Sequence, residues 1–163
     1  MTTAYSKIQG ALNKYLYEMA GLPDVIGFEN KVITPIDGEI YLKVFCLPAR
    51  PDYPFIGADT LTHEHGIFQV SVMAPAGDGW GGAYAMVDAI VSHFSRSASM
   101  TYGDGTTISI INVIGGAAIG AVGTADIDAI DITINVRRTW PSPGFPIDGR
   151  YAIPVNISYY GYM

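Results

Sequence analysis

The most chemically suggestive residues of the chain are two histidines, His63 and His65, on either side of Glu64. Residues two apart on an extended strand point to the same side, so both imidazoles would face one way, as a metal site requires. Further ligands would have to come from elsewhere, and His93 is the only other histidine. An exposed polar cluster at the start of a strand explains the pattern better. We therefore assign no metal ligand, although metal binding by His63 and His65 stays open.

A glycine-rich motif at residues 77–82 matches the G-x-G-x-x-G pattern of dinucleotide-binding loops. It lies between a predicted strand and a predicted helix, and Asp104 follows about where a ribose-binding acid is expected. Three features oppose cofactor binding: Pro75 ends the strand early, Asp78 would face an anionic pyrophosphate, and the surrounding βαβα alternation is missing. We predict a strand-to-helix turn and no cofactor.

No catalytic nucleophile or acid–base pair is evident in the sequence. There is no G-x-S-x-G elbow, and Cys46 lies in an apolar segment, which indicates a small core residue. Asp126 and Asp128 are paired carboxylates beside a glycine-rich stretch, where a solvated acidic edge explains them. We therefore expect no enzymatic activity. The competing interpretation is a small nucleotide- or metal-binding enzyme that uses residues 77–82 or the two histidines.

The composition indicates a single folded domain, residues 1–163, with a shortage of charge. Hydrophobic residues make up 49% of the chain and charged residues only 15%, against about 25% charged residues in typical domains. This composition, with a mean hydropathy of +0.25, excludes disorder. A folded monomer with so few ionic groups exposes uncharged surface, which often marks an interface.

The charges that are present are unevenly placed. The net charge is −6, and no lysine or arginine lies between Arg96 and Arg137. That interval holds four acidic residues: Asp104, Asp126, Asp128 and Asp131. Nucleic-acid binding needs cationic groups to replace phosphate counterions, so the sequence argues against stable binding of DNA or RNA.

The sequence also indicates the cellular compartment in which the protein is expected. Cys46 is the only cysteine, so no internal disulfide can form, and a reducing compartment is the natural expectation. The N-terminal residues are polar and lack the pattern of a secretory signal, which predicts a cytosolic protein. Residues 105–125 carry no charge over a length that could span a bilayer, but their polar residues and glycines argue against a membrane segment.

Hydrophobic periodicity predicts helices at residues 4–20 and 80–94 and strands at 39–47 and 66–74. Three more strands are expected at 107–113, 130–137 and 153–159. A proline-rich arm at 48–62, a glycine-rich hairpin region at 113–126 and a surface loop from Pro141 connect these elements. The order predicts an α+β fold: a mainly antiparallel sheet with two helices packed on one face, plus an extended loop and a β-hairpin.

Part of this pattern resembles the tail-terminator and minor tail proteins of long-tailed bacteriophages. The resemblance covers about residues 4–112 and 150–160 and rests on element order and apolar motifs. Its elements are the first helix, the strand 66–72 (GIFQVSV), Pro75 with the glycines, a helix with Ala85, Asp88, Ala89, Ile90 and Phe94, and the closing strand 153–159 (IPVNISY). The segment from Gly115 to Gly149 is longer than expected for that family.

The resemblance implies a subunit of the virion tail, assembled in the host cytoplasm. Such a protein forms a ring, expected to be a homohexamer, which caps the tail tube, ends its polymerisation and offers the head-tail joining surface. The implied partners are further copies of the chain, the tail tube protein and a head-completion or connector protein. DNA would pass through the ring without being bound. Another head-tail connector or tail tube component of the same general fold is the nearest alternative.

Contacts with these partners are expected from the proline-rich arm, the glycine-rich region and the C-terminus. Tyrosine is enriched at protein interfaces, and tyrosines cluster at the end of this chain. The predicted interface residues are Tyr53, Phe55, Ile56, Ile114, Ile119, Val122, Tyr160 and Tyr162.

Overall fold

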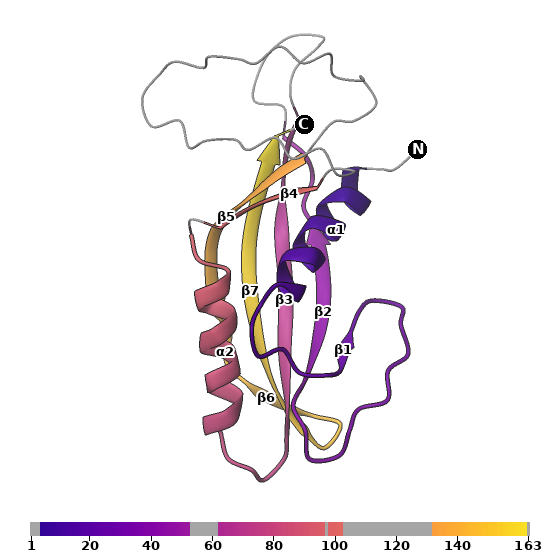
Figure 1. Cartoon of the computed structure of the whole chain (residues 1–163), viewed down its shortest axis with the longest axis vertical. Coiled ribbons are helices and arrows are strands. Elements are labelled where there is room, and N and C mark those ends of the chain that lie inside the picture. The colour runs from indigo at the N-terminus through magenta and orange to yellow at the C-terminus, as the bar shows by residue number, and fades with distance from the viewer. Residues whose placement is uncertain (1–3, 53–61, 97, 103–131, 163) are drawn as a thin grey trace.

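The computed structural model of the chain describes residues 4–52, 62–96, 98–102 and 132–162 (Figure 1). This part of the chain forms two helices, α1 (Ala4–Tyr17) and α2 (Gly81–His93). Its strands are β1 (Ile26–Gly27), β2 (Tyr41–Pro48), β3 (His63–Pro75), β4 (Ser99–Tyr102), β5 (Ile132–Pro141), β6 (Phe145–Ile147) and β7 (Arg150–Tyr162). Neither helix is long and apolar enough to cross a membrane.

The described strands form one sheet in the order β1-β2-β3-β7-β5-β4, and β6 also pairs with β7. The β1–β2 pair is parallel, and every other pair among these strands is antiparallel. Figure 1 shows the long strands β3 and β7 side by side in the centre of this curled sheet. The α+β fold class with a mainly antiparallel sheet is therefore confirmed.

Both helices pack on one face of the sheet. The apolar stripe of α1 includes Ile8, Leu12 and Leu16, which are all buried, as are Val87 and Ile90 of α2. These side chains share a single core cluster with alternate residues of the strands: Leu42, Val44, Phe68, Val70, Val72, Ile134, Val136, Ile153, Val155, Ile157 and Tyr159. The helical and strand periodicities of the sequence therefore meet in one core.

The ladder between β3 and β7 runs without a shift from the His63–Tyr162 pair to the Pro75–Arg150 pair. Because side chains alternate along a strand, the register puts Phe68 beside Ile157 in the core and Ile67 beside Ser158 on the opposite face. We call the face with the helices the inner face and the opposite face the outer face.

The strands differ from the sequence prediction mainly in length and number. The predicted strands 66–74 and 153–159 extend to residues 63–75 and 150–162. The predicted first helix stops at Tyr17 instead of residue 20. Strand β5 continues to Pro141, beyond the predicted end at residue 137, and the predicted start at residues 130–131 lies outside the described residues. Three short strands, β1, β4 and β6, were not predicted from the sequence. The predicted strand 107–113 and hairpin region 113–126 lie outside the described residues.

The loop predicted from Pro141 was wrong in part, because β6 forms a tight hairpin with β7. Asp148 and Gly149 connect the two strands with φ values of +50° and +71°. Positive φ at both central residues is the geometry of a type I′ turn, for which Asp-Gly is a favoured sequence. The Asp-Gly pair is therefore the overlooked signal for this hairpin.

The beginning of the proline-rich arm forms backbone hydrogen bonds with β3. Pro48 is the last residue of β2, and the Ala49 N–H donates to the His65 carbonyl at 2.9 Å. Asp52 forms an isolated antiparallel bridge with His63. Strand β2 therefore includes the first residue of the predicted arm, and residues 53–61 of the arm lie outside the described chain.

Gly66 on β3 lies close to the backbone of β2 and to the side chain of Tyr159. A Cβ atom there would lie 2.6 Å from the Leu47 carbonyl oxygen and 2.6 Å from the Tyr159 hydroxyl oxygen. A backbone carbonyl within a paired strand cannot move away easily. Glycine at this position therefore allows β2 and the buried Tyr159 ring to pack against β3.

Two glycine-to-alanine substitutions should change stability in opposite directions. We expect Gly66→Ala to lower the free energy of unfolding by about 1–3 kcal/mol, because the added methyl group overpacks the site. Gly82→Ala is the matched control: its Cβ would make an ordinary 3.7 Å contact with Ile40. It should raise the free energy of unfolding by about 0.5–1 kcal/mol through helix propensity. Urea unfolding of both variants tests this, and wild-type stability of Gly66→Ala would contradict it.

Candidate functional surface

One end of the outer face carries apolar and aromatic side chains that are exposed or half-buried. Alternation along β2 turns Phe45 and Leu47 outward, with exposures of 37% and 51%. On β7 the same alternation turns Tyr160 and Tyr162 outward, and Tyr162 is 49% exposed. Ile67 of β3 lies between them in the register, opposite Leu47. We call these five residues the open face.

The other end of the outer face is covered by the segment 25–40. Tyr41, Met73 and Ala152 are buried there in a small second cluster, against which Val25 and Ile33 pack. Arg150 holds this segment in place by donating to the Ile36 carbonyl at 3.0 Å and to the Glu39 carbonyl at 2.6 Å. Its guanidinium group also lies 4.9 Å from the centre of the Tyr41 ring. The segment 25–40 thus supplies the apolar cover that the open face lacks among the described residues.

A polar chain crosses the outer face between these two ends. The Gln69 side-chain amide donates to Asn156 at 3.0 Å, and the Asn156 amide in turn donates to the Ser142 hydroxyl at 2.8 Å. Asn156 is buried, so these hydrogen bonds satisfy an amide that would otherwise be costly to bury. The outer face is therefore divided into a covered end, a polar middle and the open face.

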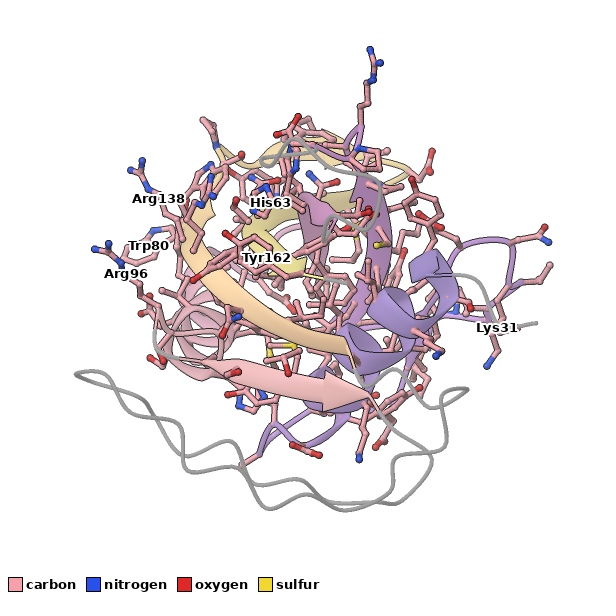
Figure 2. All side chains as sticks on the ribbon, turned by 90° about the horizontal axis from the view of Figure 1, so that it is seen from above. Lys31, His63, Trp80, Arg96, Arg138 and Tyr162 are labelled. Carbon is pink, nitrogen blue, oxygen red and sulfur yellow. The ribbon has the colours of Figure 1, made fainter. Side chains whose placement is uncertain are left out.

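Aromatic rings gather at the edge of the open face. The His63 ring lies 5.0 Å from the Tyr162 ring and 6.1 Å from the Tyr160 ring, measured between centroids. Figure 2 shows the labelled His63 and Tyr162 close together in the view from above. The guanidinium of Arg137 lies 5.3 Å from the Tyr160 centroid. Both described members of the predicted interface set therefore belong to one cluster.

The other six predicted interface residues lie outside the described part of the chain. They are Tyr53, Phe55, Ile56, Ile114, Ile119 and Val122. Of the C-terminal tyrosines, Tyr159 is a core residue with 1% exposure, and Tyr151 is half-buried against the core. Alternation along β7 turns Tyr159 to the face opposite Tyr160 and Tyr162. Composition alone cannot make this distinction.

The two histidines of the first motif lie on the same side of β3, as predicted, with their rings stacked 5.3 Å apart. The third histidine does not join them: His93 Nε2 lies 2.7 Å from the Tyr15 carbonyl oxygen, and its ring stacks on Tyr15. The residue that does join them is Asp52, which no motif in the sequence indicated.

The glycine-rich motif forms a strand-to-helix turn, as predicted. Gly77 and Gly79 have φ values of +96° and +75°, and α2 begins at Gly81. The strand after α2 is β4, which pairs with β5 and not with β3, so the parallel βαβ unit of a dinucleotide-binding fold is missing here. Trp80 is exposed on this turn, with its ring 6.0 Å from the Tyr84 ring.

Cys46 does not have the surroundings of a reactive thiol. Its Sγ lies 3.9 Å from the Tyr159 hydroxyl oxygen, on the inner face of β2. Burial raises the pKa of the thiol, and the nearby Glu29 carboxylate adds to this, although the contact with Tyr159 acts in the opposite direction. A reactive cysteine instead has a lowered pKa in electropositive surroundings. The prediction of a small core residue agrees with this position.

Arginines from two distant segments gather at one hollow of about 690 Å³. Its lining includes Arg96 after α2 and Arg137, Arg138 and Trp140 of β5. In Figure 2, Arg96 and Arg138 project on the same side of the molecule. The sequence shows these arginines only as the two ends of an interval without basic residues, so their proximity was not predicted.

The chain was compared with protein-family models, curated proteins and solved structures. A family model described as phage tail terminator protein matches residues 7–159. A solved structure matches with a TM-score of 0.63 and 19% sequence identity, over 98% of this chain and 96% of the other. At that identity the likeness shows a shared fold alone. No curated protein is significantly similar to the chain.

The surroundings of Cys46 predict that its thiol reacts slowly. We expect the native protein to react with a thiol-exchange reagent at pH 8 about tenfold or more slowly than the urea-unfolded chain, because a raised pKa and burial both reduce accessible thiolate. The absorbance of the released thiolate measures both rates. Equal rates in the native and unfolded states would contradict this description of the site.

Proposed function

Because the chain belongs to the phage tail terminator family, whose model matches residues 7–159, we propose that it forms a ring on the end of the tail tube. The ring stops polymerisation of the tube and offers the surface to which the head is joined. The family is a structural one, which fits a protein without enzymatic activity. The proposed place of action is the virion tail, after assembly in the host cytoplasm.

The observation that carries this proposal is the open face. Phe45, Leu47 and Tyr162 are each more than a third exposed on a chain with only 15% charged residues. Removing apolar surface from water is worth about 25 cal/mol per Å², so a cover for these side chains would stabilise an assembly. We propose that a second copy of the chain or the tube protein supplies that cover. The predicted contacts of Tyr53, Phe55, Ile56, Ile114, Ile119 and Val122 would extend the same interface.

The net charge of −6 supports the proposed passage of DNA. A ring with negative surroundings repels a polyanion, so DNA would move through without being held. The proposed partners are accordingly proteins: further copies of the chain in a homohexamer, the tube protein and a head-completion or connector protein.

The proposal is tested by the size and shape of the assembly. The full chain, alone and with purified tail tubes, is measured by multi-angle light scattering and imaged in negative stain. We expect rings, and we expect tubes that carry a single ring at one end and no longer elongate. Stacking of the protein into long tubes would instead identify a tube component. Failure to associate with itself or with tubes would contradict both roles.

The role of the open face is tested by placing a charge on it. Leu47→Asp should weaken assembly about tenfold or more, because a carboxylate cannot be buried in an apolar contact without a large cost. Its own fold should be preserved, since Leu47 is 51% exposed. The matched control is Val32→Asp on the 25–40 segment, where the side chain is 96% exposed.

Sedimentation velocity over a concentration series gives the assembly midpoint of both variants. If Leu47→Asp assembles at the wild-type midpoint, the open face is not part of the assembly interface. That result would leave the proposal of a ring intact.

A further inference from the structure

We propose that Asp52, His63 and His65 form a binding site for one divalent transition-metal ion, with Zn²⁺ as its occupant. The three side chains can each offer one ligand atom, and these atoms all lie within 4.8 Å of one another. The proposal rests on this geometry and is independent of the proposed ring.

The backbone fixes the positions of all three residues. The Asp52 N–H donates to the His63 carbonyl at 3.0 Å, and the His63 N–H donates to the Asp52 carbonyl at 2.9 Å. His65 is held by the Ala49 N–H, which donates to its carbonyl at 2.9 Å. On the other side of β3, His63 and His65 pair with Tyr162 and Tyr160 of β7. Both histidines are therefore held between neighbouring chain segments, so little backbone order has to be gained on binding.

One nitrogen at this site lacks a partner. His65 Nδ1 is buried and has no hydrogen-bond partner among the described residues. It lies 3.9 Å from Asp52 Oδ2, which is too long for a hydrogen bond. A buried polar atom without a partner is uncommon, and a metal ion bound by His65 Nδ1 would give this atom a partner.

The three donor atoms lie somewhat farther apart than in a formed metal site. Zinc ligands lie about 2.0–2.2 Å from the ion, so two donors of a tetrahedral site are about 3.3 Å apart. The Asp52 side chain is 68% exposed and the His65 side chain 30% exposed. Small rotations of these side chains can therefore bring the three donors to ligand distance without moving the paired backbone.

The ligand chemistry selects the ion. Two imidazoles and one carboxylate suit Zn²⁺ and its transition-metal neighbours, whereas Ca²⁺ and Mg²⁺ prefer oxygen ligands throughout. Three protein ligands leave a fourth tetrahedral position for water or for a ligand from a partner. Because the site joins residue 52 to the beginning of β3, the bound ion stabilises the folded protein in proportion to its concentration and affinity.

The test is a Zn²⁺ titration of the full chain, with any polyhistidine tag removed and metals stripped by a chelator. Isothermal calorimetry should show one ion per chain, and the melting temperature should rise with Zn²⁺ concentration. Co²⁺ used as a spectroscopic substitute should give tetrahedral visible absorption, without the thiolate charge-transfer band that ligation by Cys46 would add.

Substitutions then identify the ligands. Asp52→Asn and His63→Ala should each weaken Zn²⁺ binding about tenfold or more. Asp78→Asn is the matched control, because it removes an exposed carboxylate away from the site and should keep wild-type affinity. Circular dichroism confirms that the variants are folded. Absence of Zn²⁺ binding by the wild-type chain, or wild-type affinity in either ligand variant, would overturn the proposal.

Discussion

The antiparallel ladder between β3 and β7 is the constraint on which the rest of the molecule depends. It runs unshifted from His63–Tyr162 to Pro75–Arg150 and assigns alternate side chains to opposite faces. The inner set packs against both helices in the core, and the outer set includes the two histidines, the half-buried Tyr160 and the exposed Tyr162. A slip of one residue would bury His65 and expose Phe68, so the core and the proposed contact surface are specified together.

Side-chain periodicity was enough to predict the two helices and the central strands. Ile8, Leu12 and Leu16 follow a helical stripe, and Phe68, Val70 and Val72 alternate as a strand facing a core must. The two-residue strand β1 and the four-residue strand β4 are too short to show a period of their own, because they form by pairing with strands already in place. Only β6 left a usable local signal, the Asp148-Gly149 turn.

The surface was harder to predict because it depends on which distant residues meet. The sequence indicated that His63 and His65 would share a side, but the position of Asp52 follows from how the chain after β2 returns along β3. Likewise, Arg96 and Arg137 line the same hollow because β5 lies near the end of α2. Tyr160 and Tyr162 were predicted as interface residues, and their placement on the outer face is consistent with that role, which stays a proposal.

We propose that this member of the phage tail terminator family works through contacts made by its open face. Hydroxyl-radical footprinting, read by mass spectrometry, compares side-chain reactivity in the free chain and in the assembly on tail tubes. We predict that Leu47, Tyr160 and Tyr162 lose reactivity on assembly, whereas Tyr17, which is 57% exposed on α1, keeps it. Unchanged reactivity of the open face, with protection on the helices instead, would contradict a role of the open face in assembly.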